Sequence, residues 1–185
     1  MQTQRAEPGW NVSRHEVAAR DPVLQLQALA FDSEGGRRYR NIALQLCSGS
    51  LGWIFGGRPE DRSQFIRVVC GLQPPHAGEM RWKGANLLHA PRLMAGELVY
   101  LDRRNAVKPM LTPREHLQFH LRLRACCPRS DIDSALEQLQ LHGSADVACG
   151  KLSASAKRRV AIARLLVTRA TILVLDDPML DLEPH

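Results

Sequence analysis

The stretch that decides the fold spans residues 152–178 and reads LSASAKRRVAIARLLVTRATILVLDDP. Ser153 stands where it can cap a helix, and the apolar residues that follow recur at helical spacing. The run TILVL is typical of a strand because it is aliphatic and β-branched, and it ends on Asp176 and Asp177. A capped helix that leads into a strand with terminal carboxylates often serves a phosphate and a metal ion. A basic surface helix followed by a simple strand-end turn would give the same letters.

The first half of the chain carries strand-like patterns. Residues 23–31 (VLQLQALAF) and 39–46 (YRNIALQL) alternate apolar and polar side chains around an EGGRR turn, which predicts an antiparallel hairpin. The continuous apolar run LGWIFGG at 51–57 predicts a strand buried on both faces that opens into a glycine pair. After the polar patch RPEDR, apolar residues at helical spacing predict a helix from residue 63.

The second half alternates strands and helices. The apolar run ELVYL at 97–101 predicts a strand. Thr112, Pro113 and Glu115 form the pattern of a capping box, which predicts the start of a helix. Residues 131–143 predict a second, shorter amphipathic helix. Strands that alternate with helices over short turns indicate an α/β sheet, fronted here by the hairpin.

The composition sets the broad class of the protein. A chain of 185 residues with 44% apolar and 24% charged side chains is large enough to bury one core. The net charge of +6 suits an acidic partner if it is clustered and means only solubility if it is spread. Five cysteines without CxxC spacing indicate neither a disulfide framework nor a zinc site, and they fit a reducing cytoplasm. Since no apolar run approaches bilayer length, any membrane role is expected to be peripheral.

Three pieces follow one another in a characteristic order: a strand with a glycine pair near residue 56, a serine-capped helix near 153, and a strand ending in aspartates at 176. With this order, the chain resembles the ATP-binding subunits of ABC transporters. Their signature motif resembles LSASAKRRVAIARLL, and their Walker B strand and D-loop resemble ILVLDDPMLDLEP. Further similar stretches, such as GLQPPHAGEMRWKG, point to the ATPase subunit of the bacterial haem exporter of cytochrome c maturation.

The resemblance covers residues 23–184 and implies a fold, a domain plan and a set of site residues. The expected fold is a P-loop NTPase of the ABC ATPase type: α/β, with a mixed sheet, an antiparallel hairpin and a helical subdomain at about 109–160. Residues 1–21 are expected to be a flexible extension, and 22–185 the nucleotide-binding domain. Asp176 takes the metal-binding position and Asp177 the position of the catalytic glutamate. The implied nucleotide-binding residues are Gly56, Gly57, Arg62, Ser63 and Gln64, and the implied signature residues are Leu152, Ser153, Ala154, Ser155 and Ala156.

The P-loop letters depart from the family pattern. GxxGxGKST falls on residues 56–64, where only the first glycine and one serine remain. Pro59 has no N–H and cannot take a positive φ. Glu60 and Asp61 would bring carboxylates toward the phosphates, and one such repulsion at ~5 Å is worth about 3 kcal/mol at an effective dielectric near 20. Arg62 replaces the compact ammonium group of lysine with a broad guanidinium.

Other catalytic positions have changed as well. The glutamine that contacts Mg²⁺ aligns with Arg104, which cannot ligate a cation. Ser155 and Ala156 replace the second glycine and the glutamine of the signature. Asp177 is a methylene shorter than the family's glutamate, which leaves an attacking water about 1 Å out of reach. The D-loop aspartate is Glu183, and the chain stops at His185, so we expect it to be short of the switch histidine and of two strands.

Several residues admit both a functional and a plain structural interpretation. His116 and His120 have metal-ligand spacing, but with no third ligand in the pattern a polar helix flank is the preferred interpretation. Phe31 lies near the position of the family's adenine-stacking aromatic, and a core phenylalanine explains it equally well. Arg158 and Arg159 would serve a phosphate or a dimer partner, or would simply be solvated. The tryptophans Trp53 and Trp82 are expected in the core or at its rim.

Two functional hypotheses remain open. The first is an ATP-hydrolysing subunit of a haem-exporting ABC transporter, with ATP and Mg²⁺ as cofactors. The second is a pseudo-ATPase without cofactors, which keeps the fold and its interfaces as a scaffold or as the degenerate half of a dimer. Either would work on the cytoplasmic side of the cell membrane with a transmembrane permease subunit and a second ABC ATPase subunit, in a homo- or heterodimer. A basic nucleic-acid binder is a third hypothesis, and nucleic acid is not the expected partner.

Overall fold

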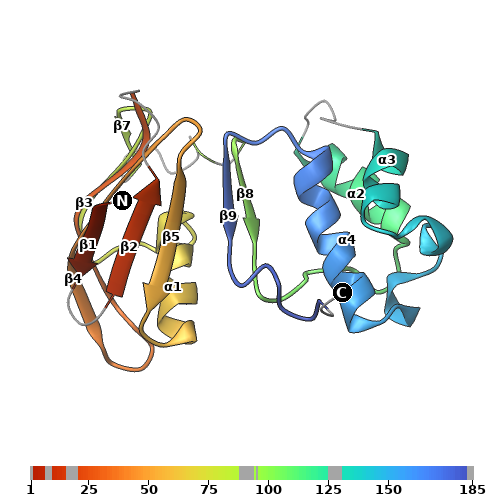
Figure 1. Ribbon diagram of the computed structural model, residues 1–185, viewed down its shortest axis with the longest axis horizontal. Coiled ribbons are helices and arrows are strands. Elements are labelled where there is room, and N and C mark those ends of the chain that lie inside the picture. The colour runs from red at the N-terminus through yellow and green to blue at the C-terminus, as the bar shows by residue number, and fades with distance from the viewer. Residues whose placement is uncertain are drawn as a thin grey trace. The chain divides into compact units, whose positions relative to one another are not determined.

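The computed structural model describes residues 2–6, 10–15, 21–87, 94, 96–124 and 131–182, with side chains from residue 21 onward. The chain forms two compact units, Met1–Ala95 and Gly96–His185, and each is described by itself (Figure 1). Glu183 and His185, on which two expectations rest, lie outside the described residues.

In its described part, the first unit contains antiparallel sheets and one α-helix. Its helix is α1 (Pro59–Val69). Its strands are β1 (Gln2–Ala6), β2 (Trp10–His15), β3 (Pro22–Asp32), β4 (Arg38–Cys47), β5 (Leu51–Gly56), β6 (Ala77–Trp82) and β7 (Ala85–Asn86). They pair in the orders β1-β2-β5 and β4-β3-β6-β7.

The predicted hairpin is confirmed. Strands β3 and β4 pair antiparallel from Pro22 opposite Cys47 to Asp32 opposite Arg38, and β6 pairs antiparallel with the other edge of β3. The alternating pattern buries one face of the hairpin, with Leu24, Leu26 and Leu29 almost inaccessible to solvent. The register between β3 and β6 shifts after Gln27, at a bulge that increases the local twist of the sheet.

Helix α1 packs on this sheet through an aromatic stack. The ring of Phe31 lies 4.9 Å from that of Tyr39 and 5.7 Å from that of Phe65, measured between centroids. All three rings are buried, and such offset contacts add to the free energy of apolar burial. Phe31 is therefore a core residue, as its structural interpretation proposed, and Trp82 is buried as expected.

Two expectations for the first unit are wrong. The sequence predicts a flexible extension over residues 1–21, yet β1 and β2 form there as an antiparallel pair whose second strand runs along β5 from Trp10 opposite Gly56 to His15 opposite Leu51. Because β2 pairs with β5 through backbone hydrogen bonds, its sequence need not carry the sustained apolar–polar alternation by which a strand is predicted. The strand β5 is not buried on both faces, because Leu51 and Trp53 are 59% and 63% exposed.

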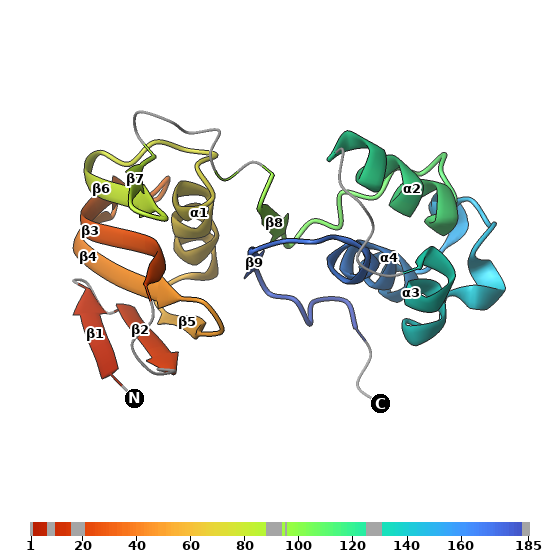
Figure 2. The same cartoon turned by 90° about the horizontal axis from the view of Figure 1, so that it is seen from above.

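The second unit joins a parallel strand pair to a helical cluster. Strands β8 (Leu98–Leu101) and β9 (Ile172–Leu175) form where their apolar runs predict, and they pair in parallel, although Leu173 and Leu175 remain partly exposed. The helices are α2 (Pro113–Leu123), α3 (Ile132–Gln138) and α4 (Ala154–Val167), with short 3-10 turns η2 (His142–Ser144) and η3 (Cys149–Lys151). Figure 2 shows α2, α3 and α4 gathered beside the strands.

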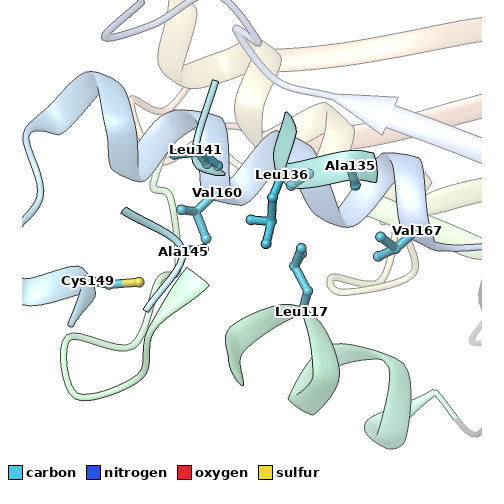
Figure 3. Packing of buried hydrophobic residues seen from close by; sticks show 9 residues of the cluster. Leu117, Ala135, Leu136, Leu141, Ala145, Cys149, Val160 and Val167 are labelled. Atoms are coloured by element: carbon cyan, nitrogen blue, oxygen red, sulfur yellow. The ribbon is translucent and has the colours of Figure 1, made fainter. Parts of the chain in front are cut away.

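One apolar cluster holds these helices together. Leu117 of α2, Leu136 of α3 and Val160 of α4 are fully buried and point toward one another (Figure 3). Ala163 and Val167 continue the buried stripe of α4 at helical spacing. The capping box at the start of α2 is confirmed, because Thr112 accepts from the N–H of Glu115 at 3.2 Å while Glu115 accepts from the N–H of Thr112 at 2.9 Å.

We expect Gly78 to be indispensable for the first unit. Its φ of +94° is strained for other residues, and a Cβ there would lie 2.5 Å from the carbonyl oxygen of Ala28. Gly84 is the matched control, because its φ is +83° but nothing lies within 4 Å. Gly84→Ala should cost about 1 kcal/mol of unfolding free energy from backbone strain, and Gly78→Ala about 3 kcal/mol or more.

The measurement is urea unfolding followed by tryptophan fluorescence, since all three tryptophans lie in the first unit. Equal costs for the two variants would contradict the close approach of β6 to the bulge in β3.

Candidate functional site

The segment at the P-loop positions folds as a short turn followed at once by a helix. Gly56 and Gly57 have φ of 87° and 62°, a conformation that glycine adopts without strain. Arg58 is extended and serves as N-cap, and Pro59 occupies the first turn of α1, so the helix begins four residues before the predicted start at residue 63. Proline favours this position because its missing N–H has no partner to lose there. The RPEDR patch is therefore mostly helix and not loop.

Arg62 turns back onto the glycine pair. Its Nη1 donates to the carbonyl oxygen of Gly56 at 2.9 Å and to that of Gly57 at 3.2 Å. Its backbone N–H is also used, because it donates to the carbonyl of Arg58 at 3.1 Å. The guanidinium that takes the lysine position thus binds its own loop.

Asp61, at the position of the last loop glycine, is a buried anchor. Its side chain is 3% exposed, and Oδ2 accepts a hydrogen bond from the hydroxyl of Tyr39 on β4 at 2.7 Å. The guanidinium of Arg37 lies 3.9 Å from the same oxygen. Asp61 and the exposed Glu60 also place negative charge in the first turn of α1, where the helix dipole stabilises it.

Gln64 fastens α1 to the turn between β3 and β4. Its Nε2 donates to the carbonyl of Asp32 at 2.9 Å, and its Oε1 accepts from the N–H of Glu34 at 2.9 Å. Ser63, the retained hydroxyl of the motif, has a buried Oγ without a hydrogen-bond partner among the described residues. The motif positions therefore hold the helix on the hairpin.

In the second unit, the strand-end aspartates differ in exposure. Asp176 is 6% exposed, and its backbone N–H extends the pairing with β8 by donating to Leu101 at 2.9 Å. Asp177 is exposed and has a φ of +49°. Its Oδ2 lies 3.9 Å from Nε of Arg103. Arg104, at the family's glutamine position, is exposed and carries a side chain that can only donate.

The signature positions begin α4 as predicted. Ser153 is the N-cap, and its hydroxyl accepts from the N–H of Ala156 at 3.1 Å. Ala154, Ser155 and Ala156 form the first helical turn, with Leu152 extended before it. This turn holds no acidic side chain, so its positive end stays available to an anion.

Arg158 is buried, which corrects the expectation of a solvated surface residue. Its side chain is 0% exposed, and its guanidinium donates to backbone oxygens of Asp102, Asp176, Asp177 and Pro178 and to the side chain of Asn105. Burial lowers the pKa of Arg158, while the nearby carboxylates of Asp177, Asp181, Asp176 and Asp102 act in the opposite direction. Arg159 lies nearer the surface, with Nη1 3.3 Å from Oε1 of Gln140.

On α2, His116 is buried and His120 is partly buried, so the pair does not form an exposed polar flank. His116 is 4% exposed, and both of its ring nitrogens lack a hydrogen-bond partner among the described residues. Burial, together with the charges of Arg164 and Lys108, lowers the pKa of His116 to about 4. Burial and the charges of Arg164, Arg124 and His116 lower that of His120 to about 4. Within the described part of the chain, no three His, Cys, Asp or Glu side chains gather as a metal site.

The family profile described as ABC transporter matches residues 39–180. The cytochrome c biogenesis ATP-binding export protein CcmA of Pseudomonas syringae pv. tomato is 33% identical over 162 residues, which span 88% of this chain and 76% of that protein. The chain belongs to the ABC transporter family, CcmA type. The CcmA protein of Sodalis glossinidius is 40% identical over 126 residues, 68% of this chain, and the match spans 60% of that relative's length.

Solved structures confirm the ABC ATPase fold. A putative ABC transporter ATP-binding protein of Pyrococcus furiosus superposes with a TM-score of 0.71 at 19% identity, over 86% of this chain and 78% of that one. The cbiO1 protein of Clostridium perfringens, part of an ABC transporter complex, gives 0.64 at 22% identity, over 89% and 69%. Among the described residues, no helix has the length and apolarity needed to cross a bilayer.

Sequence reasoning missed two side chains that organise this ABC subunit. In the sequence, Asp61 looks like a replaced glycine of the motif. No nearby residue indicates that Tyr39, 22 positions earlier, donates a hydrogen bond to it. Arg158 reads as one of a basic cluster, although its place three residues before the buried Ala161 and two before Val160 sets it on the flank of the apolar stripe. Helical phase was the available signal for Arg158, and for Asp61 there was none.

We expect Tyr39→Phe to destabilise the first unit. The change removes the donor and leaves the Asp61 carboxylate buried, which should cost about 1–3 kcal/mol of unfolding free energy. Tyr39→Phe combined with Asp61→Leu removes both polar partners and should recover part of that loss. Urea unfolding by tryptophan fluorescence measures both variants, and a Tyr39→Phe protein as stable as the parent would refute the anchor.

The histidine pair predicts acid sensitivity of the second unit. The folded pKa of His116, about 4, lies below its ordinary 6.5, so the unfolded chain takes up a proton first and stability falls as pH falls from 6.5 to 4. His116→Gln should therefore reduce the stability difference between pH 8 and pH 5 by about 2 kcal/mol. The measurement is urea unfolding followed by circular dichroism at 222 nm. His142→Gln, at an exposed site, is the control, and equal acid slopes in the two variants would contradict the prediction.

Proposed function

We propose that this chain is a subunit of an ABC transporter of the cytochrome c biogenesis export type that does not hydrolyse ATP at its own P-loop. The observation that carries the proposal is the pair of hydrogen bonds from Arg62 to the carbonyls of Gly56 and Gly57. Beside them, Asp61 and Tyr39 form a buried hydrogen-bonded pair. In this arrangement Arg62 is bonded to the backbone of the loop and Asp61 to the hydroxyl of Tyr39 on β4.

The supply of backbone donors supports this proposal. A phosphate-binding loop presents several N–H groups to the anion at a helix N-terminus. Here Pro59 has none, and the N–H of Arg62 is bonded to the carbonyl of Arg58. The N–H groups of Glu60 and Asp61 remain, next to their own carboxylates. A triphosphate that used these two donors of the first helical turn would have to approach two negative charges.

The residues also do not fit Mg²⁺ bound with a nucleotide. The hydroxyl of Ser63 is buried at the start of α1, and the arginine at position 104 offers donors only. The carboxylate of Asp176 is chemically suited to Mg²⁺, but a single carboxylate usually binds this ion together with the phosphates of a substrate. We derive no hydrolytic step for this chain.

What the chain retains favours a role in assembly. The signature turn keeps its serine cap and a helix end free of acidic residues, so it remains able to face an anion bound by another subunit. We propose that the chain pairs with a competent ABC ATPase subunit and docks on a transmembrane permease at the cytoplasmic face of the cell membrane. The names of its CcmA relatives indicate an export system of cytochrome c biogenesis.

The decisive test compares the parent chain with a variant that restores the loop, Pro59→Gly/Asp61→Gly/Arg62→Lys. The parent should show no heat of binding and no thermal stabilisation with millimolar ATP and Mg²⁺. The restored variant should bind, with a stabilisation of about 2.7 kcal/mol at a ligand concentration one hundred times Kd. Arg67→Lys, near the end of the same helix, is the control for a charge-preserving change outside the loop.

Saturable binding of ATP by the parent chain at micromolar concentration would contradict the proposal and favour the ATP-hydrolysing alternative. A coupled assay for phosphate release then separates binding from hydrolysis. Far-ultraviolet circular dichroism of each variant establishes that the loss of the Tyr39 bond has left the first unit folded.

A further inference from the structure

The guanidinium of Arg158 has an acceptor for each of its donors. Nη1 donates to the carbonyl of Asp102 at 2.7 Å and to Oδ1 of Asn105 at 3.2 Å. Nη2 donates to the carbonyls of Asp177 at 2.6 Å and Asp176 at 3.4 Å, and Nε donates to that of Pro178 at 3.2 Å. An arginine has five N–H groups in a fixed planar fork, so this side chain is fully satisfied while buried.

These hydrogen bonds join three segments of the second unit: the helix that carries Arg158 and the two segments that carry its acceptors. Arg158 itself belongs to α4, the helix that carries the signature turn. Asp102 and Asn105 follow the end of β8, and residues 176–178 follow the end of β9. The two strands are parallel neighbours, so both of their carboxyl ends meet at the same guanidinium. A second arginine of α4 adds to this link, because Nη2 of Arg164 lies 3.5 Å from the carbonyl of Asn105.

The turn after β9 depends on this support. Asp177 has a φ of +49° and Asp181 one of +63°, a conformation that costs energy in residues other than glycine and persists only where surrounding contacts hold it. Arg158 holds this turn from outside by donating to the carbonyls of Asp177 and Pro178, whereas the exposed side chain of Asp177 reaches Arg103 only at 3.9 Å. The backbone that orients both aspartates is thus held from α4.

We infer that Arg158 is a positioning residue that couples the signature helix to both strand ends, so that residues 102–105, residues 176–178 and α4 change conformation together. The inference rests on the proposed function in one respect: a subunit that does not hydrolyse ATP would use this coupling to pass movement between its signature turn and the loop after β8. The coupling itself involves no nucleotide.

The test is amide hydrogen exchange by NMR on the full chain, without ATP. The reporters are the amides of Leu180 and Leu182, which donate to Asp177 and Met179 within the turn after β9. Asn105→Ala removes one acceptor on the β8 side only. If Arg158 couples the segments, this distant change should speed exchange at Leu180 and Leu182 about threefold or more through local opening.

A double-mutant comparison separates coupling from general loss of stability. Arg158→Met should speed exchange in residues 102–105 and 176–182 together, and Asn105→Ala should add nothing at Leu180 and Leu182 in that background. Arg158→Lys should not restore the parent rates, because one ammonium group cannot donate to both strand ends. Amides of the core residues Ala135 and Leu136 should stay unchanged as the reference, and Arg159→Met, at the partly exposed neighbouring arginine, is the matched control.

An effect of Asn105→Ala that stays within residues 102–107, or that is equally large at Leu180 in the Arg158→Met background, would overturn the inference. If Arg158→Met unfolds the second unit, two single variants still decide. Asn105→Ala keeps the guanidinium of Arg158, and Arg158→Lys keeps its positive charge. Binding of ATP by the parent chain would refute the proposed function and leave these exchange rates unaffected.

Discussion

The hydroxyl of Tyr39 donates to a carboxylate buried in the first turn of α1, and the rest of the first unit is arranged around that bond. Once Asp61 is fixed against β4, the residues before it cannot form a wide loop, and α1 starts at Pro59. Gln64 secures the next turn of the helix to the β3–β4 turn, and Arg62 is left facing the carbonyls of Gly56 and Gly57. At the motif positions, Asp61, Arg62 and Gln64 thereby contribute to the stability of the first unit.

This arrangement explains how a chain can remain an ABC subunit while its P-loop changes. A glycine-rich loop is costly in conformational entropy and is stabilised mainly by the phosphate it binds. Replacing glycines with Pro59 and Asp61 lowers the entropy of the unfolded chain and supplies an internal anion for the helix N-terminus. In the second unit, Arg158 has a comparable part, because it holds both strand ends through its own hydrogen bonds.

The sequence predicted those features that depend on local periodicity and capping. The β3–β4 hairpin, the strands β8 and β9, the capping box at Thr112 and the serine cap of α4 all follow from patterns within a few residues. Features that depend on distant partners were missed. The start of α1 depends on Tyr39, and the pairing of β5 depends on the N-terminal strand β2. The burial of Arg158 depends on the carbonyls of Asp102 and Asp177. A motif comparison recognises the lost P-loop letters but does not reveal which contacts replaced them.

The central claim is that residues 56–62 are closed on themselves even when nucleotide is offered. A crystal structure of the chain grown with millimolar Mg²⁺ and a non-hydrolysable ATP analogue tests this most directly. The account predicts that α1 still begins at Pro59, that Arg62 still donates to Gly56 and Gly57, and that Asp61 stays buried against Tyr39. Electron density for β- and γ-phosphates bound by the backbone N–H groups of residues 57–63, with Arg62 turned away from the glycine pair, would contradict it.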